Sequence, residues 1–338
     1  MNRLNLQKVA QRQTLSPLLA EYFLATDPSR ALELASFATA ASGFQSWYWK
    51  TLLGQAYLKI GLLREAERQL KSSLELQDMV LTHCLLVKVY LRLDVPLTAL
   101  AHLAGATTHH PHEPSLILLT ARIQEMLNNI DTAAKSYREV LVLDGSRVEA
   151  IACLAANLFY AEKPELSLRL YRRLLQMGVG DSEVWNNVGL CCYYSLQYDM
   201  SLSCFGRALE EAAGEASVLS AVWYNIGCVA LGIGDTTLAH QAFEVAASID
   251  PHHAESYTNA ALLDLRASNT NSARANLLLA EKHGEHLFEP FYNSAVLDFK
   301  AGDVAGAFTK VQRALSIFPK HPETLELLGQ INLRFGAL

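Results

Sequence analysis

The sequence lacks any strong imbalance of charge. Its 338 residues carry 28 basic and 34 acidic side chains, which gives a net charge of −6, and no basic tract stands out. Proteins that bind nucleic acids need a clustered positive surface. We therefore do not expect nucleic acid as a partner.

Hydrophobic runs and cysteine frameworks are also missing. No window approaches an uninterrupted apolar run of membrane-spanning length, and the N-terminus lacks an apolar core followed by a small-residue cleavage site. We expect neither direct membrane insertion nor secretion. The six cysteines have no framework spacing and fall inside predicted helices, which favours reduced, mostly buried thiols in a cytosolic protein.

Motifs for catalysis and cofactor binding are absent as well. Gly232-Ile-Gly234 lacks the third glycine and the preceding strand of a dinucleotide loop. Cys191-Cys192 is not C-x-x-C, and adjacent residues on a helix point in different directions. His109-His-Pro-His112 resembles a metal cluster, but it lies at a turn without a cysteine or acidic partner at ligand spacing. We predict no enzyme activity, no cofactor and no metal site.

What the C-terminal half does contain is a repeat of 34 residues. Bulky residues recur at one position, small residues at three others, and proline recurs two steps apart. This combination is typical of tetratricopeptide repeats (TPRs). The bulky residues are Trp223, Tyr257, Phe291 and Leu325. The three sets of small residues are Gly227, Ala261, Ala295 and Gly329; Ala239, Ala273 and Ala307; and Ala246, Ala280 and Ala314. The prolines are Pro251 and Pro319.

Each repeat of this kind is a pair of antiparallel helices that pass close together. We expect Gly227 and Ala239 to let the two backbones approach, while Trp223 and Phe243 fill the space beside them. Pro251 lacks a backbone N–H and restricts the residue before it, so it should end the second helix. One repeat cannot bury its own apolar face. The predicted fold is therefore an all-α TPR solenoid, a right-handed superhelix of stacked pairs.

The same spacing extends backwards along the chain. Trp185 and Gly189 open one repeat, and Gly54 marks the first clear one. One unit is longer, and we interpret its EEAAGEAS stretch around Gly214 as a surface-loop insertion. We predict eight repeats in a single cooperative array between residues 47 and 321: 47–79, 80–113, 114–147, 148–181, 182–219, 220–253, 254–287 and 288–321.

The two ends are less regular. Residues 322–338 are expected to form a C-terminal capping helix. Residues 1–46 are expected to form a degenerate helical segment, with helices over 16–25 and 30–41 separated by Asp27-Pro28. Residues 1–14 show no strong pattern and are interpreted as a tail or an arm on a partner.

The first helix of each TPR lines a concave groove, and its sixth position points inward. Asparagine fills this position in four consecutive repeats, which we call the Asn column: Asn187, Asn225, Asn259 and Asn293. Carboxamides offer donors and acceptors, which suits gripping the backbone of an extended peptide. The alternative is that these asparagines serve only local hydrogen bonds.

The second position of the same helices is mostly glutamate, including Glu183, Glu255 and Glu289. A carboxylate in a first turn interacts favourably with the helix dipole by about 0.3–1 kcal/mol, so a local explanation is sufficient. These carboxylates also disfavour a chaperone-tail adaptor, because TPR clamps that hold a C-terminal carboxylate need lysine or arginine there. Near the groove, they favour lysine or arginine on a partner.

Four long segments resemble one TPR family more closely than the repeat consensus requires. They are residues 47–75, 148–178, 185–209 and 223–246, and they are similar to the family of tetratricopeptide repeat protein 8, the eighth Bardet–Biedl syndrome family. The resemblance weakens before about residue 30.

The resemblance implies a scaffold subunit of the BBSome, a coat-like complex that carries membrane proteins to and from cilia. The implied partners are other BBSome subunits, namely a β-propeller-bearing subunit, a small extended subunit and a neighbouring TPR subunit. The implied locations are the cytoplasm, the cilium, the ciliary basal body and the centrosomal region. The alternative function is a generic TPR adaptor, either a chaperone cofactor or a subunit of another assembly.

Overall fold

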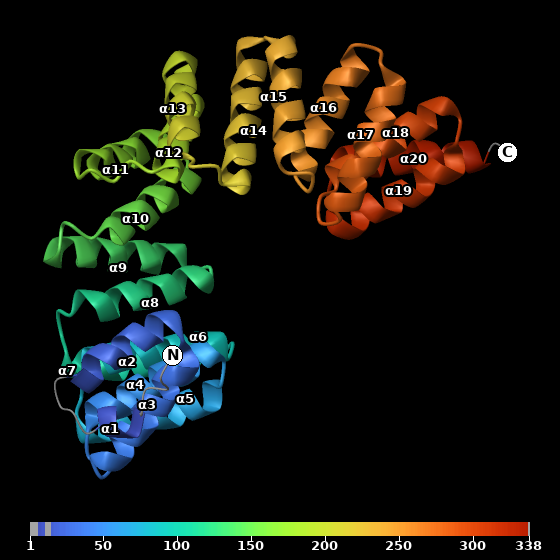
Figure 1. Ribbon diagram of the computed structural model, residues 1–338. Helices are drawn as coiled ribbons and strands as arrows, with labels where there is room; N and C mark the ends of the chain where they lie inside the picture. Colours follow the sequence, from blue (N-terminus) through green and yellow to red (C-terminus); the bar gives the residue numbers. More distant parts are fainter. Residues whose placement is uncertain (1–5, 11–14, 337–338) are drawn as a thin grey trace, which may run out of the picture. The chain divides into compact units, whose positions relative to one another are not determined.

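A computed structural model describes residues 6–10 and 15–336 of the chain. Over these residues the chain forms twenty α-helices and no strand, which confirms the all-α prediction (Figure 1). The helices are α1 (Leu6–Ala10), α2 (Leu15–Thr26), α3 (Pro28–Ala41), α4 (Trp47–Ile60), α5 (Leu63–Leu76), α6 (Val80–Arg92), α7 (Pro96–His109), α8 (Pro114–Met126), α9 (Ile130–Leu143), α10 (Val148–Tyr160), α11 (Pro164–Gln176), α12 (Ser182–Tyr194), α13 (Tyr198–Glu211), α14 (Ala216–Ile233), α15 (Thr236–Ile249), α16 (Ala254–Arg266), α17 (Thr270–His283), α18 (Glu289–Ala301), α19 (Val304–Ile317) and α20 (Pro322–Gly336).

The chain divides into two compact units. The first ends at Asn157 and the second begins at Leu158, so the division falls inside α10. The sequence predicts one cooperative array of repeats, and the packing groups the helices into these two compact units.

In the second unit each first helix packs against the helix that follows it. Figure 1 shows α14 and α15 side by side as an antiparallel pair, and their mutual contacts are extensive. The close approach has a clear cause, because a Cβ atom on Gly227 would lie 2.6 Å from Cε1 of Phe243. A Cβ atom on Gly189 would lie equally close to Cε1 of Phe205. In both pairs a buried ring rests directly on helix backbone, which only glycine allows.

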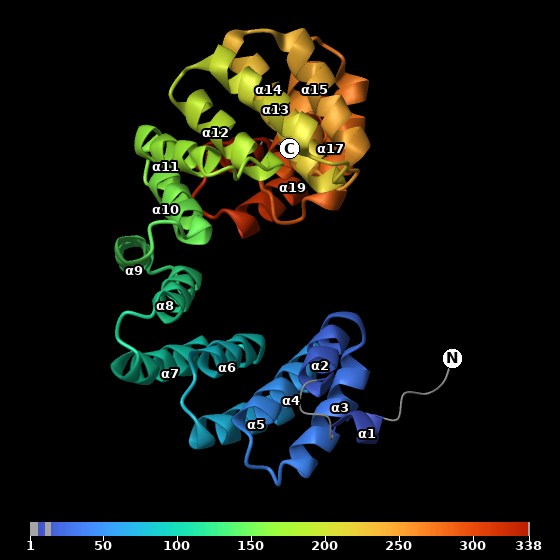
Figure 2. The ribbon, with the colours of Figure 1, turned by 60° about the vertical axis from the view of Figure 1, so that its left-hand side comes forward.

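The first unit is built in the same way. The pairs α4 with α5, α6 with α7 and α8 with α9 all pack together, and these helices can be followed by their labels in Figure 2. Leu70 on α5 occupies the place of the aromatic ring, and its Cγ atom would lie 2.7 Å from a Cβ atom on Gly54. Leu70, Leu103 and Tyr137 are fully buried second-helix residues.

The turn between α14 and α15 is short and capped. α14 ends at Ile233, and the φ of 92° at the following Gly234 lies in the left-handed region that glycine adopts at little cost. The Asp235 side chain then accepts a hydrogen bond from the backbone N–H of Leu238 at 2.9 Å, which satisfies an unpaired donor at the start of α15. α15 ends at Ile249, so Pro251 lies in the turn that follows.

The insertion around Gly214 differs from its sequence interpretation. Only residues 212–215 lie outside helices, because α13 runs to Glu211 and α14 already begins at Ala216. The extra turn of α14 carries Val218, which packs against the apolar cluster that contains Phe205 and Ile226. Burial of this side chain favours helix over loop, so the stretch is not wholly a surface loop.

The lengthened α14 also contradicts the expectation that no apolar segment reaches membrane-spanning length. By length and composition alone, the 18 residues Ala216–Ile233 are apolar enough to cross a membrane. The sequence reading missed this window because it counted the first turn as loop. In the structure α14 packs against α12, α13 and α15, as a core helix of a solenoid does.

The N-terminal segment is more ordered than the sequence predicted. Asp27 caps α3 by accepting from the backbone N–H of Arg30 at 3.3 Å, with Pro28 as the first helical residue. The expected tail contains α1, which packs against α3 and buries Val9, so this part is not a free arm. Residues 1–5 and 11–14 lie outside the described residues.

At the other end, α20 packs on α19 and also contacts α18. Its side chains Leu327 and Ile331 join the apolar cluster of Ala307 and Val311. Residues 337 and 338 of the expected capping segment lie outside the described part of the chain.

Candidate functional site

The Asn column lies entirely in the second unit, on the first helices of four successive pairs. Asn187 is on α12, Asn225 on α14, Asn259 on α16 and Asn293 on α18. All four side chains are partly exposed. The sequence spacing therefore places one carboxamide at an equivalent, solvent-accessible point of each pair.

Two members of the Asn column connect neighbouring first helices. The Asn225 amide donates from Nδ2 to Oδ1 of Asn186 on α12 at 2.8 Å. The Asn259 amide donates from Nδ2 to the hydroxyl of Tyr224 on α14 at 3.3 Å. These bonds support the local alternative for Asn225 and Asn259, because one amide function of each is already engaged within the solenoid.

Asn187 and Asn293 behave differently. Within the described part of the chain, neither side chain makes a hydrogen bond. Both carboxamides therefore keep their full set of donors and acceptors for a partner. The Asn column is chemically heterogeneous, with two connecting members between two open ones.

The glutamates expected beside the Asn column begin the same helices. Glu183, Glu255 and Glu289 lie in the first turns of α12, α16 and α18. Glu183 and Glu289 are exposed. Oε2 of Glu255 lies 3.7 Å from Nδ1 of His253, and its side chain is 44% exposed. All three carboxylates are thus accessible to a cationic partner.

The sequence analysis did not identify two buried carboxylates. Asp264 on α16 is 4% exposed and accepts hydrogen bonds from Ser272 at 2.7 Å and Asn276 at 3.0 Å, both on α17. Its other oxygen lies 3.1 Å from Nε2 of His240 on the preceding helix α15. One carboxylate thereby bonds to the helices on both sides of it.

Asp298 repeats this arrangement one pair later. It is 7% exposed on α18 and accepts from Arg274 on α17 at 3.1 Å and from Lys310 on α19 at 2.9 Å. Asp298 follows Asp264 by 34 residues, Arg274 follows His240 by 34, and Lys310 follows Asn276 by 34. The sequence signal was therefore present, but the sequence analysis did not follow the repeat through these aspartate and basic positions.

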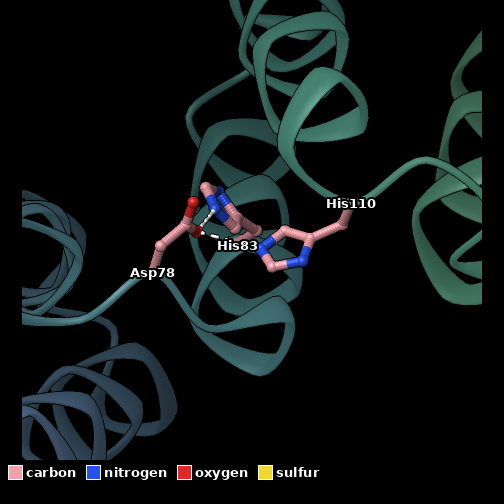
Figure 3. A group of neighbouring side chains, drawn as sticks. All are labelled: Asp78, His83 and His110. Atoms are coloured by element: carbon pink, nitrogen blue, oxygen red, sulfur yellow. Dashed lines mark hydrogen bonds and ion pairs between the residues drawn. The ribbon is translucent and has the colours of Figure 1, made fainter.

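A histidine cluster in the first unit also went unrecognised. Asp78, between α5 and α6, faces histidines from α6 and from the end of α7, as Figure 3 shows for His83 and His110. Its Oδ1 lies 2.5 Å from Nε2 of His83 and 3.2 Å from Nε2 of His110. Its Oδ2 lies 2.9 Å from Nδ1 of His109. We call these four residues the Asp78 cluster.

This geometry gives residues 109–112 an acidic neighbour that the sequence analysis did not find. The His109 side chain is 68% exposed, but His110 is only 29% exposed and has an acidic neighbour. Asp78 precedes His110 by 32 residues, so ligand spacing along the chain gave no sign of it. The stacking of one repeat on the next brings them together.

The histidines shift the titration of the Asp78 carboxyl. Burial opposes ionisation, but polar contacts with His83, His110 and His109, together with the charge of His83, outweigh it and lower the pKa of Asp78 from 3.8 to about 2. The carboxylate is therefore ionised throughout the physiological range.

The six cysteines differ in how their surroundings shift the pKa of the thiol. Burial raises the pKa of the thiols of Cys84, Cys153, Cys191 and Cys228. Cys192 differs, because a hydrogen bond from Cys204 on the paired helix lowers its pKa. Both of these thiols are buried.

Comparison with known proteins places this geometry in a family context. The tetratricopeptide repeat family matches residues 220–253, which contain most of α14 and all of α15. Among solved structures, the Cut9–Hcn1 hetero-tetramer of the APC/C matches with a TM-score of 0.57 and 12% identity. That match covers 95% of this chain and 64% of the other. At that identity the likeness shows the fold alone.

Curated relatives match along the whole chain. Tetratricopeptide repeat protein 8 of Mus musculus is 44% identical over 340 residues, covering 100% of this chain and 66% of the relative. Tetratricopeptide repeat protein 8 of Homo sapiens is 41% identical over 366 residues, covering 100% of this chain and 68% of the relative. The chain thus spans about two thirds of the length of these relatives.

A more distant similarity reaches a protein with a different name. BBSome complex member BBS4 of Bos taurus is 23% identical over 205 residues, covering 61% of this chain and 39% of the relative. This name associates the bovine relative with the BBSome.

Proposed function

The chain belongs to the family of tetratricopeptide repeat protein 8, and from this premise we propose that it is a non-enzymatic scaffold subunit of the BBSome. The observation that carries the proposal is high identity to curated family members across the entire chain, joined by weaker similarity to a BBSome member. The proposal extends to transport of membrane proteins to and from cilia. It includes residence in the cytoplasm, the cilium, the basal body and the centrosomal region.

The proposed mechanism is protein binding along the first helices of the second unit. Asn187 and Asn293 offer unengaged carboxamides. Asn225 links α14 to α12, and Asn259 links α16 to α14. An extended segment of a small partner subunit would receive backbone hydrogen bonds from the open members. Glu183, Glu255 and Glu289 favour lysine or arginine on that segment.

The partners we propose are a β-propeller-bearing subunit, the small extended subunit and a neighbouring TPR subunit. The Asn column suits the extended subunit, because main-chain hydrogen bonding does not depend on side-chain identity. Purifying the tagged chain from ciliated cells and identifying the co-purified proteins tests the assignment. Recovery of chaperones without BBSome subunits would instead support a generic TPR adaptor.

Substitution of the open asparagines tests the binding surface. The double variant Asn187→Ala with Asn293→Ala removes no hydrogen bond within the described chain, so the fold should be retained. Binding of the extended subunit should weaken by about 1–3 kcal/mol, or roughly 5- to 150-fold, for two lost hydrogen bonds. Affinity is measured by calorimetry with the purified partner.

Two comparison variants sharpen this experiment. Asn225→Ala with Asn259→Ala should also lower the free energy of unfolding, because it removes the bonds to Asn186 and Tyr224. Exposed second-helix residues provide the control, with Gln241→Ala and Lys282→Ala expected to leave binding unchanged. Loss of binding only in the control would move the interface to the second helices and reject the Asn column.

Charge reversal at Glu255 and Glu289 separates electrostatic steering from backbone recognition. Exposed charges act mainly on association rate, and salt screens them over about 8–10 Å. The double change to lysine should therefore slow association at low salt and have less effect at high salt. Association kinetics insensitive to both the substitutions and the salt would remove these carboxylates from the proposed surface.

A further inference from the structure

The Asp78 cluster brings together the residue types that hold transition metals. Single ligand atoms of Asp78, His83 and His110 all lie within 4.8 Å of one another. They come from the loop between α5 and α6, from α6 itself and from the residue that caps the C-terminal end of α7. Three separate segments of the first unit therefore converge on one small volume (Figure 3).

The distances are close to those a metal ion requires. Ligand atoms bound at about 2.0–2.1 Å in a tetrahedral zinc site lie roughly 3.3 Å from one another. Nε2 of His110 is already 3.2 Å from Oδ1 of Asp78. Nε2 of His83 is nearer, at 2.5 Å from the same oxygen, while the widest separation in the group is 4.8 Å. Binding an ion would therefore require the carboxylate to move outward and the two imidazoles to move closer together.

One atom in the cluster has an unmet requirement. Nε2 of His110 is buried and has no hydrogen-bond partner among the described residues. Oδ1 of Asp78 lies 3.2 Å from this nitrogen, a distance at which a carboxylate attracts positive charge. A buried nitrogen without a partner is costly, and a bound cation would satisfy it.

The surrounding residues orient these ligands. Nδ1 of His83 lies 2.9 Å from Nε2 of His102, so its second nitrogen is held while Nε2 faces Asp78. Nδ1 of His109 lies 2.9 Å from the other oxygen of Asp78. Metal-binding histidines and carboxylates normally have such outer partners, which fix tautomer and orientation.

We propose that Asp78, His83 and His110 bind one Zn²⁺ ion, with water at the fourth position. Two imidazoles and one carboxylate suit zinc better than the hard cations Mg²⁺ and Ca²⁺, which prefer oxygen ligands throughout. The ion ties the loop between the first two repeats to the end of α7. This site departs from the sequence prediction of no metal, which relied on the absence of an acidic partner.

Zinc titration of the complete chain tests the proposal. The protein is stripped with a chelator, dialysed and titrated with ZnCl₂ in a calorimeter. We expect one zinc ion per chain, and at least tenfold weaker binding in Asp78→Asn and His110→Ala, each of which removes one ligand. Neither Mg²⁺ nor Ca²⁺ should bind in its place.

A histidine pair elsewhere provides the matched control. Nδ1 of His252 lies 3.0 Å from Nδ1 of His283 at an exposed place in the second unit, without a carboxylate between them. The variant His252→Ala with His283→Ala should keep the zinc affinity of the unmodified chain. Zinc binding lost in this variant and kept in Asp78→Asn would overturn the proposal, and so would the absence of zinc binding.

Cobalt substitution gives a readout that does not depend on whether the variants fold. Co²⁺ bound by two nitrogens and oxygen in a tetrahedral site gives intense visible absorption bands, whereas octahedral Co²⁺ in water is nearly colourless. The unmodified chain should develop these bands up to one equivalent, and added zinc should abolish them. A spectrum that stays like that of aqueous Co²⁺ contradicts the site.

Discussion

Asp264 on α16 and Asp298 on α18 are buried carboxylates at the same place in successive repeats, 34 residues apart. Each bonds to the second helix before it and to the second helix after it. A solenoid is stabilised by contacts between neighbouring repeats, so these carboxylates lie where such contacts matter most. They add polar, direction-specific contacts to the apolar packing between pairs.

We expect Asp298→Ala to destabilise the chain by about 2 kcal/mol, because Arg274 and Lys310 would lose their buried partner. The estimate is at the low end for buried pairs, since the Arg274 side chain is 47% exposed. Urea denaturation measures the loss. Glu210→Ala is the control, because its pair with Arg207 is more than 60% exposed on both sides and should contribute less than about 1 kcal/mol. Equal losses in the two variants would contradict the structural role of Asp298.

Two helical glycines should respond in opposite directions to alanine. Gly227→Ala places a Cβ atom 2.6 Å from the Phe243 ring and should cost about 1–3 kcal/mol through overpacking. Gly206→Ala, on an exposed face of α13, meets nothing within 4 Å and should add about 0.5–1 kcal/mol of helix stability. Thermal unfolding of both variants compares them. A gain in stability from Gly227→Ala would show that the α14–α15 pair is looser than its packing indicates.

Removal of residues 322–338 should cause aggregation. α20 covers the apolar cluster of α18 and α19 with Leu327 and Ile331, and a solenoid needs a polar cap at each end. Light scattering after size exclusion measures the association state. The single variant Ile331→Ala should cost about 2–5 kcal/mol, whereas Leu333→Ala on the same helix, 77% exposed, should be almost neutral. A truncated chain that stays monomeric with an unchanged melting curve would argue against a capping role.

His102 should make the first unit less stable in mild acid. Burial, together with the charges of His83 and Lys71, lowers the pKa of His102 below 6.5, although Asp78 opposes the shift. A lowered pKa means that the unfolded chain takes up the proton first as pH falls. The associated stability is therefore present above pH 6.5 and is lost as the pH falls toward the folded-state pKa.

Replacement of this group tests that sign. The free energy of unfolding of the unmodified chain should fall more steeply between about pH 7.5 and pH 5.5 than that of His102→Gln. The exposed His286→Gln is the control and should follow the unmodified chain. Parallel pH profiles for all three proteins would remove His102 as a source of acid sensitivity.

The repeat spacing could be recognised from sequence because the contacts it reports recur at a constant interval. Gly227 and Phe243 are separated by only sixteen residues in one helix pair, and the same relation recurs at Gly189 and Phe205. A spacing of 34 residues therefore identifies helix pairs wherever close packing requires a small residue opposite an aromatic ring. The repeat spacing did not predict α1 or the first turn of α14. There, Val9 and Val218 pack against apolar residues that do not belong to the repeat pattern.

The candidate sites were less accessible to sequence reasoning. The sequence positions identified the equivalent asparagines. They did not show that Asn225 and Asn259 bond to the preceding repeat while Asn187 and Asn293 do not. Which way a carboxamide turns depends on what the adjacent helix presents. Asn186 and Tyr224 provide hydrogen-bond acceptors for Asn225 and Asn259, and these acceptor residues are not part of the repeat pattern.

The sequence by itself determined the class of fold, the pairing of neighbouring helices and the family, because all three depend on residue types at regular intervals along the chain. Only the tertiary structure decided which polar side chains meet. Asp78 reaches His110, and Asp298 reaches Arg274 and Lys310, through the stacking of one repeat on the next. The physical reason is that stacking places residues from different helices within a few ångströms, and local periodicity carries no information about the orientation of their side chains.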